Sequence, residues 1–190
     1  VAATTVSLIK EFVGDPVVPG DVASLRFTIT NFDRSASATG IAFTDDLDAT
    51  LAGLSAVASL PSDPCGAGST VSGTSLVTLT GGTLGPGASC SFDVPLQVPA
   101  GSASGSYPNT TSTLTADLGG VSGAYPAATD TLFVSAAPRL VKEFVDDPVA
   151  AGGTTTLRFT ITNTDTTSTA STPWNGSGNW ARAWWRYCST

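Results

Sequence analysis

The stretch LIKEFVGDPVVPGDVASLRFTITN occupies residues 8–31 and predicts a pair of β-strands. In its second half, Leu25, Phe27 and Ile29 are separated by single polar residues, which is the period of a strand with one buried face and one wet face. Residues 6–13 alternate in a similar way. Proline and glycine residues between the two segments are typical of a turn.

The same stretch returns 132 residues later as LVKEFVDDPVAAGGTTTLRFTITN, at residues 140–163. When residues 8–33 are aligned with 140–165, 17 of the 26 positions are identical. A repeat this close, at the length of one domain, indicates that the chain comes from a tandem array. We therefore expect a complete repeat over residues 1–135, a linker at 136–139, the opening strands of a second repeat at 140–170, and an atypical Trp-rich tail at 171–190.

The remainder of the first repeat predicts further short strands separated by turn signals, with no helix beyond a single turn at residues 49–54. These strands are expected at residues 41–44, 71–80, 90–98, 107–118 and 128–134. Pro95 lacks an N–H, so its strand is expected at a sheet edge or with a bulge. About seven or eight short strands without crossover helices predict an all-β fold, an immunoglobulin-like antiparallel β-sandwich.

The composition excludes several classes of function. The net charge is −7 and the eight basic residues are scattered, which argues against a nucleic-acid partner. Histidine is absent, so the commonest general base and the commonest transition-metal ligand are both missing. No apolar run is long enough to predict a transmembrane segment. We therefore expect a protein that is not an enzyme.

Four blocks of the first repeat follow one another in order: LRFTITN at 25–31, IAFTDDL at 41–47, LGPGASC at 84–90 and YPNTTS at 107–112. Together they resemble the bacterial immunoglobulin-like repeats of unknown function that occur in tandem in large surface and secreted proteins. The resemblance extends from residue 5 to about residue 134, and it resumes in the second copy. It implies a non-catalytic spacer or adhesive module outside the cytoplasm, with neighbouring repeats or identical subunits as partners.

Cys65 and Cys90 are the two cysteines of the complete repeat, one in a loop and one at the start of a strand. A disulfide between them would close a loop of about two dozen residues and would stabilise the fold by roughly 3 kcal/mol. Export from the cell favours such a bond. Two separate buried thiols are the alternative, whereas a nucleophile or metal ligand is disfavoured because no histidine can activate the thiol.

Asp45, Asp46 and Asp48 cluster after an expected strand and are candidate ligands for Ca²⁺, the only cofactor that the sequence leaves open. Their spacing matches no EF-hand, and the alternative is that they are solvated turn or cap residues. Their use as an acid/base pair in glycoside hydrolysis is disfavoured, because no aromatic platform lies near them. Asn109 and Asn175 begin triplets of the N-glycosylation pattern, which we interpret as coincidence in a sequence of bacterial type.

The second copy stops matching the first near residue 170. Residues 173–190 contain all four tryptophans and Cys188 but no acidic residue. A changed reading frame or a foreign terminus is one interpretation of this shift. An aromatic and basic helix that binds a membrane surface or a partner groove is another, and packing within a core or strand is the third.

The two strands expected in the second copy lack the rest of a sandwich to cover them. An isolated hairpin is marginally stable in water, and an apolar strand edge is a template for pairing. We therefore expect these strands to be disordered, to fold back on the first repeat, or to add to a sandwich in another molecule. The predicted interface residues are Leu140, Phe144, Leu157, Phe159 and Ile161.

Two functional hypotheses follow. The first is a structural or adhesive repeat of an extracellular bacterial surface or secreted protein. The second is a self-assembling extracellular filament subunit, in which strands within 140–163 complement a neighbouring sandwich. A carbohydrate-binding module is disfavoured, because residues 1–106 contain no cluster of tryptophan or tyrosine.

Overall fold

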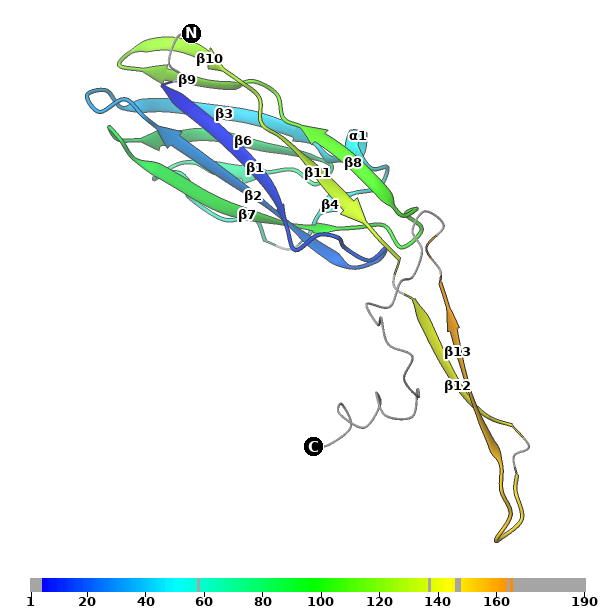
Figure 1. The fold of residues 1–190 in the computed structure, drawn as a ribbon. Helices are drawn as coiled ribbons and strands as arrows, with labels where there is room; N and C mark the ends of the chain where they lie inside the picture. Colours follow the sequence, from blue (N-terminus) through cyan, green and yellow to red (C-terminus); the bar gives the residue numbers. More distant parts are fainter. Residues whose placement is uncertain (1–4, 58, 137, 146–147, 164, 166–190) are drawn as a thin grey trace, which may run out of the picture.

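Two antiparallel sheets face each other in the computed structural model, which describes residues 5–57, 59–136, 138–145, 148–163 and 165 (Figure 1). The first sheet has the order β1 (Val6–Val13), β2 (Val22–Asn31), β7 (Ser89–Gln97), β4 (Ser55–Ala56). The second has the order β10 (Val121–Tyr125), β9 (Leu114–Leu118), β3 (Ala38–Asp46), β6 (Leu76–Leu84), β5 (Thr70–Ser72). Strands β11 (Thr129–Val134) and β8 (Gly105–Thr110) form a two-stranded sheet. The predicted immunoglobulin-like β-sandwich is confirmed.

The core lies between the two sheets and is centred on β2, whose alternation brings Leu25, Phe27 and Ile29 inward without exposed surface. The ring of Phe27 packs between two other aromatic rings, with centroid distances of 4.9 Å to Phe43 and 5.4 Å to Phe92. These three rings come from β2, β3 and β7. They therefore join both sheets at the middle of the sandwich.

Strand β1 shares the alternation of β2 but contains a charged residue at an inward position. Leu8, Lys10 and Phe12 all point into the sandwich and are all buried. Beyond β1 the chain runs parallel to the end of β11: the Val17 N–H donates to the Phe133 carbonyl at 2.9 Å. The first and last strands of the repeat therefore lie side by side.

The helical turn begins two residues earlier than predicted, because Asp46 caps it. Helix α1 spans Leu47–Thr50, and the Asp46 side chain accepts a hydrogen bond from the Ala49 N–H at 3.0 Å. This is the usual role of an aspartate at a helix N-cap. The preceding strand is also longer than predicted and includes Asp45.

Two segments predicted as single strands are divided in the structure. Residues 71–80 form a hairpin of β5 and β6, with Gly73 at φ 97° in the turn. A Cβ at this glycine would lie 1.9 Å from the Leu76 carbonyl oxygen, so only glycine fits. Residues 107–118 divide into β8 and β9, and between them Ser112 and Thr44 exchange two hydrogen bonds. Strand β10 is a further strand that the sequence analysis missed.

Pro95 lies in β7 where its missing N–H costs no pairing with β2. Its carbonyl accepts the Val57 N–H at 2.9 Å, on the side of β7 that faces β4. Strand β4 has only two residues, which pair with Leu96 and Gln97. Strand β7 is thus neither an edge strand nor bulged, and the expectation for Pro95 was wrong, because β7 has β2 on one side and the short β4 on the other. The proline is tolerated because its missing N–H lies on the side of β4, where little strand pairing is needed.

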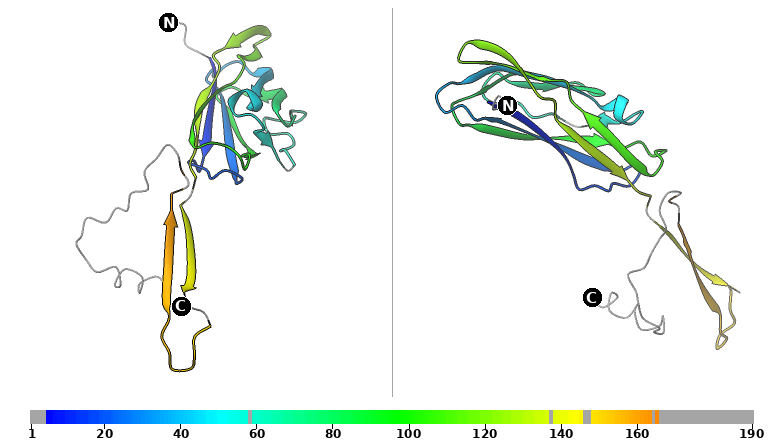
Figure 2. Two further views of the ribbon diagram at one scale, coloured as in Figure 1. Left: turned by 90° about the vertical axis from the view of Figure 1, so that its right-hand side faces the viewer. Right: turned by 45° about the horizontal axis from the view of Figure 1, so that its top comes forward.

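Strands β12 (Arg139–Val145) and β13 (Thr156–Thr162) form a separate antiparallel hairpin. It projects from the end of the sandwich where β11 ends (Figures 1 and 2). Its register repeats that of the first hairpin: Leu140 pairs with Ile161 as Leu8 pairs with Ile29. The second copy of the repeat thus keeps both the sequence and the pairing of the first. Residues 166–190, which contain the Trp-rich tail and Cys188, lie outside the described residues.

Candidate functional site

The disulfide predicted between Cys65 and Cys90 is present. The two Cα atoms lie 5.3 Å apart, and the bond links the loop before β5 to the start of β7. Cys65 is buried, and its backbone N–H donates to the Ser69 hydroxyl at 3.0 Å. Both thiols are consumed by the bond, so neither is available as a nucleophile or metal ligand.

The three aspartates proposed as calcium ligands have different partners in the structure. Asp45 is buried, and its Oδ2 lies 2.6 Å from the Lys10 ammonium. Asp46 caps α1, and Asp48 accepts the Gly53 N–H at 2.7 Å. Among the described residues, no three acidic, cysteine or histidine side chains converge on a metal position. Calcium binding by Asp45, Asp46 and Asp48 stays a prediction.

Three buried polar side chains come from β1, β3 and β8, and we call Lys10, Asp45 and Asn109 the buried polar triad. The side chains of Lys10 and Asp45 have no exposed surface, and Asn109 is 2% exposed. The second carboxylate oxygen of Asp45, Oδ1, has no hydrogen-bond partner, and neither does the Oδ1 or the Nδ2 of Asn109. Buried polar atoms are nearly always hydrogen-bonded, so three unpaired polar atoms on two residues of the triad require an explanation.

Asp130 on β11 links Asn109 to the first strand. It pairs in register with Asn109 across β8 and β11. Its Oδ2 accepts the Phe12 N–H at 2.6 Å, two residues along β1 from Lys10. On the other side, the hydrogen bonds between Ser112 and Thr44 hold the chain after β8 against the residue before Asp45. Strand β11 thus lies beside β1 and pairs with β8, and β8 contacts β3, which places Asn109 on a strand next to those that surround Lys10 and Asp45.

Burial lowers the pKa of the Lys10 ammonium from its usual value, while the attraction of Asp45 and, more weakly, Asp130 opposes that shift. The Lys10 nitrogen also lies 5.8 Å and 5.7 Å from the ring centroids of Phe12 and Phe27. Removal from water is therefore the main influence on Lys10, and it disfavours the charged ammonium.

Sequence reasoning missed Lys10 and Asn109 as site residues. A signal was present, because Lys10 lies between Leu8 and Phe12 at an inward position of the strand. Asn109 was considered only for glycosylation, and its burial makes it inaccessible to that modification in the folded protein.

The five predicted interface residues lie on one face of the hairpin of β12 and β13, which we call the apolar hairpin face. Their side chains are between 37% and 66% exposed, whereas their counterparts in β1 and β2 are at most 7% exposed. These residues are Leu140, Phe144, Leu157, Phe159 and Ile161. Apolar residues at matching positions of the two hairpins are thus buried in the first copy and exposed in the second.

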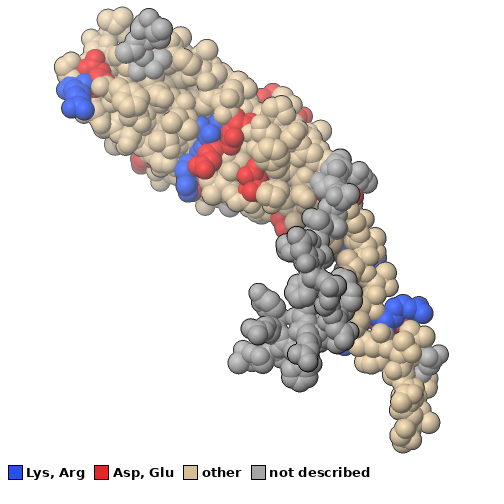
Figure 3. Space-filling model, in the orientation of Figure 1, with Lys and Arg blue, Asp and Glu red and all other residues tan. Residues whose placement is uncertain are grey.

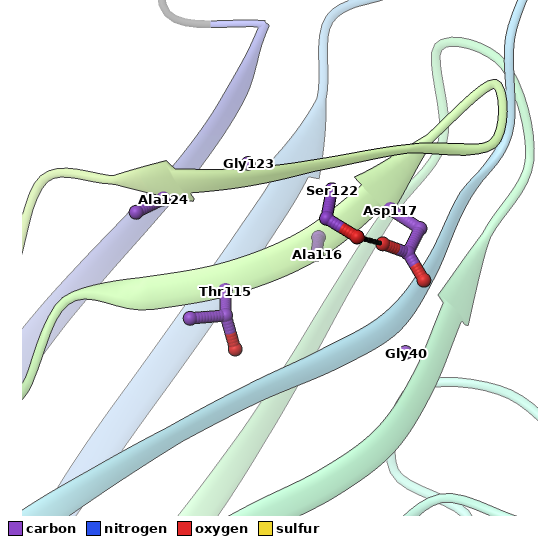
Figure 4. A pocket seen from close by; sticks show the side chains of 7 residues that line it. All are labelled: Gly40, Thr115, Ala116, Asp117, Ser122, Gly123 and Ala124. Carbon is purple, nitrogen blue, oxygen red and sulfur yellow. Dashed lines mark hydrogen bonds between the residues drawn. The ribbon is translucent and has the colours of Figure 1, made fainter.

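A shallow hollow lies over β3, β9 and β10, and Figure 4 shows its lining. Its polar groups are Asp117 and Ser122, whose hydroxyl donates to the Asp117 carboxylate, together with Thr115. A serine next to an aspartate lacks the intervening base that a nucleophilic hydroxyl needs, and the chain contains no histidine. The hollow therefore supports no catalytic assignment.

Charged side chains are sparse on the sandwich face seen in Figure 3, and the basic ones lie beside acidic ones. Arg26 on β2 and Asp93 on β7 form a two-pronged ion pair, with distances of 2.8 Å and 3.0 Å between their nitrogen and oxygen atoms. No helix among the described residues is long and apolar enough to cross a membrane.

Comparison with solved structures gives likenesses in fold. A variant of BcpA, the major pilin subunit of Bacillus cereus, is 14% identical with a TM-score of 0.54 over 75% of this chain and 44% of the pilin. BcpA itself is 15% identical with a TM-score of 0.50 over 72% and 42%. The seventh ScaB type I cohesin of Pseudobacteroides cellulosolvens is 10% identical with a TM-score of 0.45 over 68% and 93%. The chain thus spans less than half of the pilin's length.

A search of curated proteins finds no match. The model of one protein family, described as "Domain of unknown function (DUF7933)", matches residues 7–134. This range contains both facing sheets, the disulfide and the buried polar triad, and it is more than half of the chain. The chain therefore belongs to the family of domains of unknown function DUF7933.

Proposed function

We propose that this chain is a non-catalytic structural or adhesive module from a tandem array in an extracellular bacterial protein. The observation that carries the proposal is the repeated hairpin. Residues 140–163 reproduce the sequence of 8–31, and β12 and β13 reproduce its pairing. A chain that starts the same fold again directly after completing it is built as an array.

The path of the chain suits a module that transmits tension. Strand β1 begins at one end of the sandwich and β11 ends at the other, where the second hairpin starts (Figure 1). Next to β11, Val17 donates to Phe133 and accepts from the Ser135 N–H, both at 2.9 Å. A pull on the two ends therefore loads these hydrogen bonds together, in shear.

The disulfide and the low content of charged residues support the proposed extracellular location. A structural disulfide persists in oxidising compartments and is rare in reducing ones. Only 12% of the residues are charged. Both features suit a secreted spacer, and the likeness to a pilin fold is consistent with them.

Single-molecule pulling tests the structural role. With handles at Thr5 and Ser135, we expect unfolding at a higher force than with handles at Val6 and Asn31. The second pair lies across β1 and β2, so that their hydrogen bonds open one after another. Equal or lower force in the end-to-end geometry would contradict a module that transmits tension.

The apolar hairpin face supports a second candidate, a filament subunit. Phe144 and Leu157 pair across β12 and β13 and are exposed, whereas Phe12 and Leu25 pair identically and are buried. The second hairpin thus needs the remaining strands of a sandwich to cover it. An identical subunit that accepts these strands in a head-to-tail manner would extend into a fibre.

A further inference from the structure

The buried polar triad contains the three functional groups that are needed to make an amide bond between side chains. Lys10 supplies an amine, Asn109 a carboxamide, and Asp45 a carboxylate that can accept and donate a proton. The Lys10 nitrogen already lies 2.6 Å from Asp45 Oδ2. The other oxygen of Asp45 and both polar atoms of Asn109 have no hydrogen-bond partner.

We propose that Lys10 and Asn109 become joined by a covalent amide bond that the folded domain forms by itself, with Asp45 relaying the proton. This inference goes beyond the structural role proposed above and does not depend on it. It assigns a modification site to three residues that otherwise form an unexplained polar cluster in the core.

The reaction is balanced without any oxidant or co-reactant. Asp45 takes a proton from the Lys10 ammonium, which leaves a neutral amine. The amine nitrogen attacks Cγ of Asn109, and a bond forms between Nζ and Cγ. Asp45 then gives its proton to the Asn109 nitrogen, the bond from Cγ to Nδ2 breaks, and ammonia leaves, while Asp45 takes the surplus proton from the attacking Lys10 nitrogen. One amine and one carboxamide thus become one secondary amide and one ammonia.

The environment favours the first step. Burial lowers the pKa of the Lys10 ammonium from its usual value, and Asp45 Oδ2 lies 2.6 Å away to accept the proton. A neutral amine is the nucleophilic form of lysine. Two groups held together inside a folded domain also react as one molecule, which removes the entropic barrier of bringing them together.

The product resolves the unsatisfied groups in the cluster. The orphaned Nδ2 of Asn109 departs as ammonia, and a buried ion pair is replaced by a neutral amide. The new amide N–H is a donor beside Asp45, whose Oδ1 lacks one. Without the bond, a carboxamide with neither atom paired would be a costly residue to bury.

Asp45 is the other conceivable acceptor, because it already contacts Lys10. A Lys10–Asp45 bond would release water rather than ammonia. It would also leave both atoms of Asn109 buried and unpaired, so it explains less of the cluster. The two bonds are distinguished by the mass that the protein loses.

Intact mass spectrometry of the purified full chain, after reduction of the disulfide, tests the proposal. We expect a mass lower than that of the sequence by one ammonia. Trypsin should fail to cleave after Lys10 and should release a branched peptide in which residues 1–26 are joined to 35–139. The unaltered sequence mass would overturn the proposal, and a deficit of one water would overturn the choice of Asn109.

Substitutions assign each role. Lys10→Arg, Asn109→Ala and Asp45→Asn should each restore the full sequence mass of the variant. Asn109→Asp keeps the size of the side chain and should lose one water instead of one ammonia, which tests the acceptor without removing it. Lys142→Arg is the matched control, because Lys142 occupies the position of Lys10 in the exposed second hairpin. This variant should still be lighter than its sequence mass by one ammonia. A Lys142→Arg variant with its full sequence mass would contradict the assignment.

Discussion

Asp33 organises the loop between β2 and β3 through a single carboxylate oxygen. Its Oδ1 accepts from the Ser35 N–H and hydroxyl, both at 2.8 Å, and from the Ala36 N–H at 2.9 Å. The backbone hydrogen bond from Ser35 is the main cause that lowers the pKa of Asp33 from its usual value. This carboxylate is therefore more stable in the folded protein than in the unfolded chain.

A pH series tests this local anchor. Since the folded pKa lies below the unfolded one, the stabilisation is complete above the ordinary aspartate value of about 3.9 and is lost as the pH falls through the folded value. Asp33→Ala should lower the urea midpoint at neutral pH, and the gap to wild type should close in the acid range. Asp21→Ala, in an exposed turn, is the control. A gap that stays constant with pH would rule out the charge as the cause.

The residue types in the sequence predicted the disulfide but did not indicate Lys10 and Asn109 as candidates for an amide bond. Cys65 and Cys90 were found because cysteine has few roles in a protein without histidine. Lys10 and Asn109 were missed because alternation shows which side of a strand a residue faces, but not which inward residues of different strands meet. That meeting depends on the hydrogen bonds of Asp130 and Ser112, which no local pattern encodes.

At the scale of elements, clear alternation over many residues predicted β2 and β7. Short turns caused the errors. The Gly73 turn divides a predicted strand into β5 and β6, and β10 was missed although it pairs with β9 in a five-residue register. Apolar residues contribute little to these edge elements, so their positions are determined by turn geometry and by neighbouring strands rather than by a hydrophobic pattern.

The disulfide ties one of these weakly patterned regions to a well-patterned strand. It closes a separation of 25 residues between the loop before β5 and the start of β7. Replacing both cysteines, Cys65→Ser with Cys90→Ser, should lower the free energy of unfolding by about 2–4 kcal/mol. Urea unfolding measures the change, and wild type in reductant should match the variant. Equal stability of oxidised wild type and variant would show that the bond does not constrain the unfolded chain.

At the scale of the whole molecule, the chain combines a covered repeat with an uncovered one. In the first repeat, β1 and β2 are covered by the facing sheet and flanked by β7 and β11. The hairpin of β12 and β13 presents the same apolar residues to solvent. Exposed apolar strands of this length are expected to pair with another molecule unless a following segment covers them.

Light scattering over a concentration series tests whether the apolar hairpin face mediates association. If a second copy covers this face, the full chain should form larger species as its concentration rises, and the double substitution Leu157→Lys and Ile161→Lys should keep it monomeric. The matched control is Thr156→Lys with Thr160→Lys, which adds the same charge to β13 at positions that alternate with the apolar ones. It should associate like wild type. A wild-type chain that stays monomeric at the highest concentration, or apolar-face variants that associate equally, would exclude the filament subunit and leave the tandem module.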